Sequence, residues 1–214
     1  MEEKMNTYLF DFDGTLVDSM PTFSGLMIRI LDEHGIKYGD DIIKIITPLG
    51  YNGTATYFIE EMGLQKSHEY LTSLMLKYAV DAYTNVVPAK EYVIDALKEL
   101  KKRGASLNVL TASPHEALDP CLKRLGIYDI FDNVWSCNDF ATTKADPEIY
   151  RMAAERIGVP VNEVVFLDDN LGADKTAKTA GMVVYGVYDE SSKEYVDEMK
   201  AATDKYIYDF RELL

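Results

Sequence analysis

Apolar and polar positions follow different patterns in successive stretches of this chain. Residues 8–10 form a short apolar run that ends in carboxylates, which is typical of a buried parallel strand. Between residues 21 and 83 the apolar positions instead repeat at helical spacing, and glycines and prolines separate the segments. The residues that share such helical faces are Met27, Ile30 and Leu31, then Tyr57, Phe58 and Met62, then Leu71, Leu74, Met75 and Tyr78. No segment there is typical of a strand, so this stretch predicts a small helical bundle.

Beyond Pro88 the pattern alternates between helices and strands. Ser113 has the position of an N-cap, with Pro114 as the first helical residue and Glu116 in the capping-box place. Further helices are expected over about 89–103, 147–157, 170–180 and 191–200, and strands over 107–110, 134–136, 164–167, 182–185 and, at an edge, 206–208. This alternation predicts an α/β fold, namely a Rossmann-like parallel sheet with helices on both faces.

The domain organisation follows from these patterns and from the length of 214 residues. That length exceeds one average domain and falls short of two. We therefore expect one Rossmann-like core made of residues 1–17 and 86–214, with residues 18–85 inserted as a small, all-helical cap.

Polar side chains follow three of the expected strands at the points where the strands end. Asp11 and Asp13 follow the first strand, Thr111 and Ser113 follow the second, and Asp168 and Asp169 end a later one. In parallel sheets ligands bind at the carboxyl ends of the strands, so these residues should share one edge. Carboxylates gathered there repel one another unless a cation neutralises them, and oxygen ligands suit a hard ion such as Mg²⁺. One of Asp168 and Asp169 is also expected to cap the helix that follows.

The segment Asp11-Phe12-Asp13-Gly14-Thr15 resembles the first signature of the haloacid dehalogenase superfamily. Thr111, Lys144 and the pair Asp168-Asp169 match further signatures of that family in the expected order. The resemblance covers the whole chain, and the helical insert lies where the family places a cap. It is closest to the phosphoglycolate phosphatase and β-phosphoglucomutase type.

This resemblance implies a Mg²⁺-dependent phosphatase that acts on a small-molecule phosphate monoester. Asp11 would be the nucleophile that forms an aspartyl phosphate, and Asp13 the general acid and base. Lys144 and Thr111 would hold phosphate oxygens. The residues expected to bind the substrate are Phe12, Gly14, Thr111, Ala112 and Lys144, and those expected to bind the metal are Asp11, Asp13 through its backbone carbonyl, Asp168 and Asp169.

Two rival hypotheses stay open. Sugar-phosphate mutases of the same family share all four signatures, but they carry a His after the first motif and basic residues on a cap loop. Residues 20–23 contain no His, and the expected cap loop 48–53 contains no Lys or Arg, which favours hydrolysis. The other rival is a phosphate- or protein-binding module without catalysis, because a fold does not imply a function.

Composition and charge narrow the class of partner. The formal net charge is −14, and the only notable basic run, residues 101–103, lies where a helix should end, so nucleic acid is not expected to bind. Cys121 and Cys137 lack metal-ligand spacing, and neither a signal peptide nor a membrane-spanning run is evident. These features favour a cytoplasmic protein, and a monomer is plausible.

Asp174 is a departure from the family pattern. Many relatives place an Asp four residues after the metal-binding one, and that position here is Ala173. Asp174 either substitutes for the missing carboxylate or faces solvent.

Overall fold

The computed structural model describes residues 6–46 and 49–214, and it divides the chain into two compact units. The core unit comprises the described residues up to Asp18 together with Pro88–Leu214, and the insert unit is Ser19–Val87. The chain thus leaves the core unit once and returns to it once. That the insert unit acts as a cap stays a prediction.

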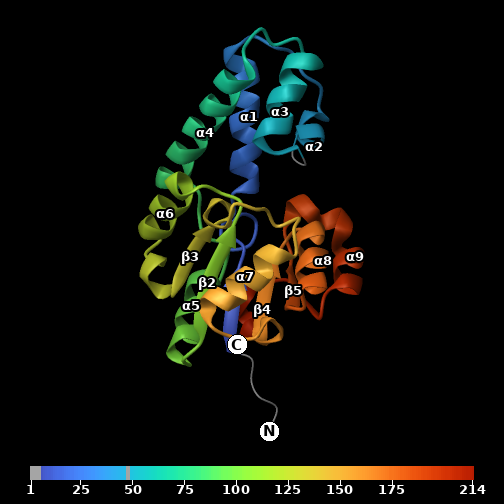
Figure 1. Cartoon of the computed structure of the whole chain (residues 1–214). Coiled ribbons are helices and arrows are strands. Elements are labelled where there is room, and N and C mark those ends of the chain that lie inside the picture. The colour runs from blue at the N-terminus through green and yellow to red at the C-terminus, as the bar shows by residue number, and fades with distance from the viewer. Residues whose placement is uncertain (1–5, 47–48) are drawn as a thin grey trace. The chain divides into compact units, whose positions relative to one another are not determined.

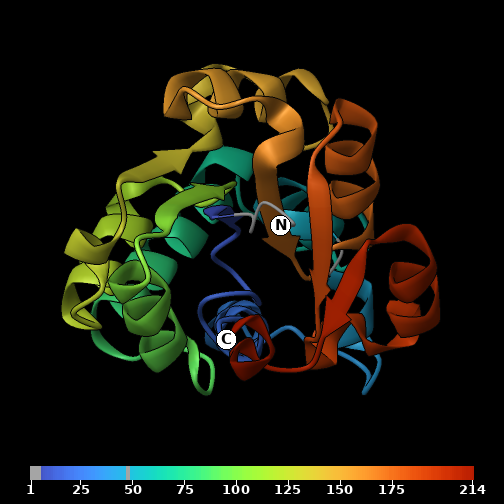
Figure 2. The same ribbon diagram turned by 90° about the horizontal axis from the view of Figure 1, so that it is seen from below.

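The core unit is built around one six-stranded sheet (Figures 1 and 2). The strands are β1 (Thr7–Phe10), β2 (Ser106–Thr111), β3 (Asn133–Ser136), β4 (Val164–Asp168), β5 (Val183–Val187) and β6 (Lys205–Ile207). Their order is β3-β2-β1-β4-β5-β6, and every neighbouring pair is parallel. This confirms the predicted Rossmann-like α/β fold.

Helices of the core unit cover both faces of the sheet. The α-helices are α5 (Val93–Lys102), α6 (His115–Arg124), α7 (Glu148–Ile157), α8 (Leu171–Ala180) and α9 (Val196–Ala202). Short 3₁₀ helices are η2 (Tyr128–Ile130), η3 (Cys137–Phe140), η4 (Val161–Glu163), η5 (Glu190–Tyr195) and η6 (Phe210–Leu213). The helix expected over 191–200 is therefore divided between η5 and α9.

The central strand β1 explains how the two faces are filled. Leu9 is fully buried in a cluster with Tyr150 of α7 and Ala177 of α8. The neighbouring Phe10 stacks on Phe210 of η6, with the ring centroids 6.0 Å apart. Because successive side chains of a strand point to opposite faces, the apolar run that predicted β1 is buried on both sides.

The insert unit consists of α1 (Met20–Glu33), α2 (Ile42–Ile46), α3 (Gly50–Glu60) and α4 (His68–Asn85) (Figure 1). Its described residues include no strand, as predicted. Residues from the predicted helical faces form one buried cluster, among them Met27, Phe58 and Leu71. None of the helices in the described ranges has the length and hydropathy needed to cross a bilayer.

The expectation of a cap loop over residues 48–53 is wrong for residues 50–53. Gly50–Gly53 form the first turn of α3, and the buried Thr54 donates a hydrogen bond to the Ile46 carbonyl at 3.3 Å. Glycines are tolerated in a first turn that neighbouring contacts hold in place. Pro48, which the expected loop included, lies outside the described residues.

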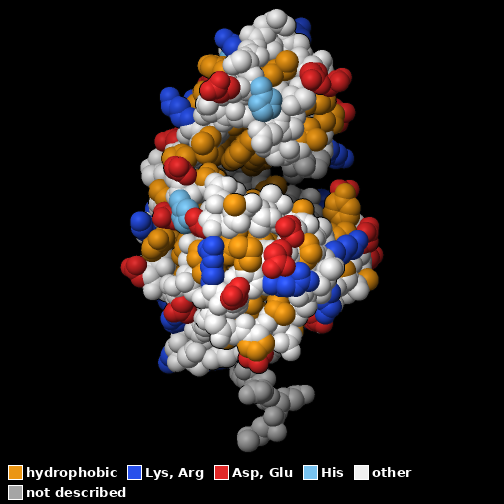
Figure 3. Space-filling model, in the orientation of Figure 1, with side chains coloured by type: hydrophobic (Ala, Val, Ile, Leu, Met, Phe, Trp, Pro, Cys, Tyr) orange, Lys and Arg blue, Asp and Glu red, His pale blue; other side chains and the backbone are white. Residues whose placement is uncertain are grey.

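Charged side chains of both signs alternate on the visible face of the core unit, so that face carries no extended basic patch (Figure 3). Lys101 pairs with Asp132 at 2.5 Å, and Arg103 pairs with Glu99 at 2.9 Å. The basic run that ends α5 is therefore occupied by local ion pairs.

Candidate active site

The site begins where β1 and β4 end side by side. In the register of the sheet Phe10 is level with Leu167, and the N–H of Asp11 donates to the Leu167 carbonyl at 2.8 Å. This extra bond extends the pairing by one residue. It holds Asp11 beside Asp168, although the two residues are far apart in the sequence.

Asp11, Asp168 and Asp169 form a buried cluster that we call the acidic group. Their exposed fractions are 5, 1 and 7%. One carboxylate oxygen from each lies within 4.8 Å of the oxygens from the other two. The side chain of Asp13 is not part of this cluster, and metal binding through its backbone carbonyl stays a prediction.

The ammonium group of Lys144 lies against two members of the acidic group. It donates to Oδ2 of Asp168 at 2.8 Å and also to Oδ1 of Asp11. Burial alone would lower the pKa of Lys144, but Asp11 and Asp168 hold that pKa well above its usual value. The tertiary fold thus places a permanently charged cation beside the expected nucleophile.

The carboxyl groups of this cluster resist ionising together. Burial is the main cause that raises the pKa of Asp11 to about 8; Lys144 opposes the shift, and Asp168 and Asp13 add to it. Burial, followed by Asp168 and Asp11, raises the pKa of Asp169 well above its usual value. A divalent cation among these oxygens would stabilise their ionised forms, so the donor set fits Mg²⁺.

Asp13 accepts a hydrogen bond from Ser113, which the sequence placed at the same edge of the sheet and also assigned as a helix N-cap. The Ser113 hydroxyl donates to Oδ2 of Asp13 at 2.5 Å, and the Ser113 N–H donates to the hydroxyl of Thr111 at 3.0 Å. The predicted helix N-cap at Ser113 is wrong, because α6 begins at His115 and Pro114 is its N-cap residue. Since the hydroxyl binds Asp13, it does not cap the helix.

Gly14 and Thr15 place Asp169. Gly14 has a φ of +76°, and a Cβ at this position would lie 2.3 Å from Oδ2 of Asp169. The Thr15 hydroxyl donates to Oδ1 of Asp169 at 3.0 Å. Only glycine leaves room for the carboxylate here, so the turn after β1 and the end of β4 are fitted to each other.

The other predicted substrate-binding residues lie near these groups along the chain. Phe12 is fully buried, and its carbonyl accepts hydrogen bonds from Leu16 and Val17, which closes the turn after β1. Thr111 is buried at the end of β2, and Ala112 after it is exposed. Their roles in phosphate binding stay predictions.

The cap of α8 is neither Asp168 nor Asp169. Asn170 is the N-cap residue, and its side chain accepts hydrogen bonds from the N–H groups of Gly172 and Ala173 at 2.9 and 3.1 Å. An amide oxygen at this position leaves Asp169 available to the acidic group.

Asp174 does not face solvent. Its exposed fraction is 0%, and no described residue forms a hydrogen bond with either carboxyl oxygen. Burial is the largest cause that raises the pKa of Asp174 to about 9, and Asp168 and Asp169 raise it further. Asp174 is thus a buried carboxyl close to the acidic group but not among its members.

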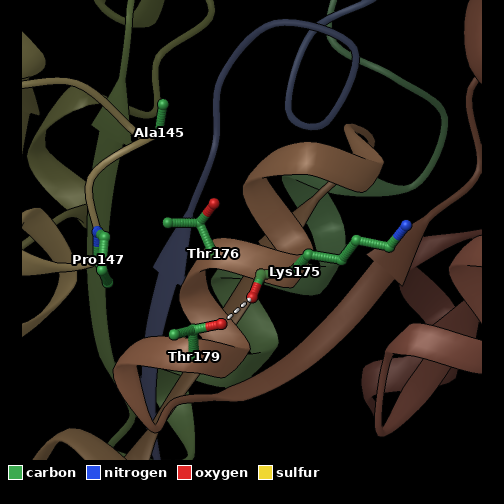
Figure 4. Close-up of a pocket in the computed structure, with 5 residues that line it drawn as sticks. All are labelled: Ala145, Pro147, Lys175, Thr176 and Thr179. Atoms are coloured by element: carbon green, nitrogen blue, oxygen red, sulfur yellow. Dashed lines mark hydrogen bonds between the residues drawn. The ribbon is translucent and has the colours of Figure 1, made fainter.

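A shallow hollow of about 200 Å³ lies beside the N-terminal end of α7 (Figure 4). Ala145, Pro147, Lys175, Thr176 and Thr179 line it. The hydroxyls of both threonines donate to carbonyls of their own helix, at 2.8 Å for Thr176 and 2.9 Å for Thr179. No member of the acidic group lines the hollow, and the two threonine hydroxyls already donate within their helix. We therefore assign no catalytic role to the hollow.

Two residues in contact with the site were not predicted to belong to it. In the sequence Thr15 belongs only to the first motif, and none of the motifs includes Lys90. Nζ of Lys90 donates to the Gly14 carbonyl at 2.6 Å. No local pattern in the sequence signals such a contact.

The chain is similar in sequence and in fold to several known proteins. The model of the haloacid dehalogenase-like hydrolase family matches residues 5–181. Pyrophosphatase PpaX of Bacillus velezensis is 28% identical over 188 residues, which are 87% of this chain and 84% of the relative. Phosphorylated carbohydrates phosphatase of Thermotoga maritima is 26% identical over 184 residues, which are 86 and 85% of the two chains. A predicted phosphoglycolate phosphatase from Haemophilus somnus shares the fold with a TM-score of 0.84 at 19% identity, covering 100% of this chain and 98% of its own.

Proposed function

Because the chain belongs to the haloacid dehalogenase-like hydrolase family, we propose that it is a Mg²⁺-dependent phosphatase of small-molecule phosphate monoesters that works through a phosphate ester on Asp11. The observation that carries this proposal is the contact of one lysine, Lys144, whose side chain is 14% exposed, with both Asp11 and Asp168. A nucleophile, a cation beside it and further carboxylates for a metal are the parts that phosphoryl transfer to a carboxylate needs.

In the proposed reaction an oxygen of the Asp11 carboxylate attacks phosphorus. A P–O bond to Asp11 forms as the P–O bond of the ester breaks, and the leaving oxygen takes a proton from Asp13. A water molecule then attacks the same phosphorus while Asp13 takes a proton from that water. This releases inorganic phosphate, restores the Asp11 carboxylate and leaves Asp13 protonated for the next substrate.

The other groups of the site support these two steps. Asp11, Asp168 and Asp169 would hold Mg²⁺, which supplies positive charge to a phosphate oxygen when it is bound. Lys144 and Thr111 would bind the remaining phosphate oxygens as negative charge spreads over them. Ser113 would keep the carboxyl of Asp13 turned toward the leaving oxygen.

The class of substrate is proposed from the relatives. Among them are a phosphorylated carbohydrates phosphatase and an N-acetylmuramic acid 6-phosphate phosphatase, the latter 28% identical over 193 residues. These names support a small phosphorylated metabolite. Cys121 and Cys137 are both buried and form no disulfide with each other, which supports the proposal of a reducing compartment such as the cytoplasm.

The test is phosphate release from a panel of monoesters, which includes phosphoglycolate, hexose and pentose phosphates, glucose 1-phosphate and nucleoside monophosphates. We expect Mg²⁺-dependent release by the wild type, loss of release on adding a chelator, and no release by Asp11→Asn. Asp95→Asn, which changes an exposed carboxyl on α5, is the matched control and should keep full activity. Isomerisation of glucose 1-phosphate without release would support the mutase, and silence of the folded, Mg²⁺-loaded protein in both assays would support a binding module.

A further inference from the structure

Lys90 connects three separate segments of the core unit. Its Nζ donates to the Gly14 carbonyl at 2.6 Å, to the Tyr188 carbonyl at 2.5 Å and to Oδ2 of Asp189 at 3.0 Å. The side chain is 18% exposed. An ammonium group has three donors, so these contacts use all of them.

The backbone around Lys90 is paired with the turn after β1. The Lys90 N–H donates to the Leu16 carbonyl at 3.0 Å, and the Asp18 N–H donates to the Pro88 carbonyl at 3.0 Å. Both the main chain and the side chain of Lys90 therefore hold the same turn. Lys90 follows closely on the point where the chain returns from the insert unit at Pro88.

The turn that contains Gly14 and Thr15 also holds the carboxylate of Asp169 in place. The Cα of Gly14 is so close to Asp169 that a Cβ would lie 2.3 Å from its Oδ2, and Thr15 donates to its Oδ1. A shift of Gly14 and Thr15 would therefore shift or release Asp169. In the described chain no hydrogen bond joins Lys90 to a member of the acidic group, so its side-chain contacts reach Asp169 only through Gly14. Its positive charge also acts on Asp169 directly, and it opposes the rise in the pKa of that carboxyl.

Asp189 is a well-held counterion for Lys90. Its Oδ1 accepts from the N–H and the hydroxyl of Ser191, at 2.9 and 2.6 Å, so both oxygens are used. Burial alone would raise the pKa of Asp189, but Lys90 and Ser191 hold that pKa below its usual value. The ion pair anchors the ammonium group while its other donors hold the two carbonyls.

We propose that Lys90 is a positioning residue of the metal site, which holds the Gly14 carbonyl and thereby keeps the Asp169 carboxylate in place to bind Mg²⁺. This inference rests on the proposed function, because it assumes that Asp169 is a metal ligand. Two simpler roles compete with it. In the first of these roles Lys90 would act only as a positive charge near the metal site. In the second it would act only as the partner of Asp189 in a structural ion pair.

The three roles predict different Mg²⁺ affinities. Removal of a cation near the site would by itself tighten Mg²⁺ binding, because Lys90 and Mg²⁺ repel each other. Loss of positioning would weaken it, and changes to groups that orient metal ligands typically cost about 10- to 100-fold in affinity. Loss of a structural ion pair alone would lower the stability and leave the affinity of the folded protein unchanged.

The experiment is calorimetric titration of the metal-free, full-length protein with MgCl₂. We expect Lys90→Met to bind Mg²⁺ about 10-fold or more weakly, as for other supporting residues. Asp189→Asn should stay within about threefold of the wild type, because it retains the Lys90–Gly14 contact and changes only the charge. Affinity of Lys90→Met that is equal to or tighter than that of the wild type would overturn the proposal.

A double variant covers the case in which Lys90→Met does not fold because Asp189 is left buried without its partner. Lys90→Met/Asp189→Asn has the same net charge as the wild type, and it leaves no carboxylate at position 189 without its partner. It still lacks the contact with Gly14, so we expect Mg²⁺ to bind about 10-fold or more weakly, as in Lys90→Met. If the double variant binds Mg²⁺ as tightly as the wild type, the positioning role of Lys90 is overturned, but the proposed function is not. A wild type that binds no Mg²⁺ would instead overturn the metal site and the proposed function together with it.

Discussion

Asp174 should make the stability of the folded protein fall as the pH rises. This carboxyl is fully buried in α8, and no described residue forms a hydrogen bond with it. Burial, together with Asp168 and Asp169, raises its pKa from 3.8 to about 9. Between these two pH values the unfolded chain loses a proton that the folded protein keeps.

The magnitude follows from proton linkage. Where the folded state binds one more proton than the unfolded state, the free energy of unfolding falls by about 1.4 kcal/mol per pH unit. Between pH 5 and pH 7 the group therefore lowers the free energy of unfolding by about 3 kcal/mol. The effect is absent below the unfolded pKa of 3.8, where both states are protonated.

The perturbation is Asp174→Asn, which keeps the shape of the side chain and removes its titration. Urea unfolding of metal-free wild type and variant at pH 5, 6 and 7 gives the difference in their unfolding free energies. We expect the variant to gain on the wild type by about 3 kcal/mol from pH 5 to pH 7. Other buried carboxyls are present in both proteins. As long as Asp174 stays protonated it carries no charge that acts on them, so their titration cancels in the difference.

Asp204→Asn is the matched control with the opposite sign. Partial burial would raise the pKa of Asp204, but Lys178 and the N–H of Val184 hold that pKa below its usual value. The stability that this group contributes is present above its unfolded pKa, so the Asp204→Asn difference should stay constant between pH 5 and pH 7. If the Asp174→Asn difference is equally constant, Asp174 is ionised in the folded protein and the reasoning is refuted.

Two further predictions concern the contacts that hold Asp169 and Asp13. Gly14→Ala would place a Cβ on the Asp169 carboxylate, so Mg²⁺ affinity should fall about 10-fold or more. Gly104→Ala is the control, because Gly104 has a similar φ of +83° and no atom lies within 4 Å of the new Cβ. It should lower the stability by about 1–2 kcal/mol and leave the Mg²⁺ affinity unchanged, and calorimetry measures both quantities. Ser113→Ala removes a hydrogen bond to Asp13. This bond is worth about 1.5–3 kcal/mol in the step in which Asp13 is ionised, so turnover should fall about 10-fold or more. Its Mg²⁺ affinity should stay unchanged, and full turnover would show that Ser113 does not orient Asp13.

The strands and their contribution to the site were predictable because the signals are local. Residues 8–10 are all apolar because both faces of a parallel strand inside the sheet are buried. This pattern does not depend on which strands are its neighbours. The edge formed by the carboxyl ends follows from parallel pairing alone. It places Asp11 and Asp168 at the same edge of the sheet. That they lie side by side depends on the order of the strands, in which β1 and β4 are neighbours.

Helix starts were predicted less well, because several residues near a start can serve as caps. Ser113 has the chemistry of an N-cap, but its hydroxyl binds Asp13. Asp168 and Asp169 also have that chemistry, but Asn170 caps α8. In both cases a contact with a distant segment decides between local alternatives of similar free energy.

The sequence by itself determined the fold class, the helical insert and the acidic residues at the strand ends. Each of these depends on periodicity or on a short motif, which are properties of neighbouring residues. The tertiary structure alone decided that Lys90 holds Gly14, that Thr15 holds Asp169 and that Asp174 is buried. These contacts join segments that are far apart in the chain, and they form only after the sheet has set the distance between the segments.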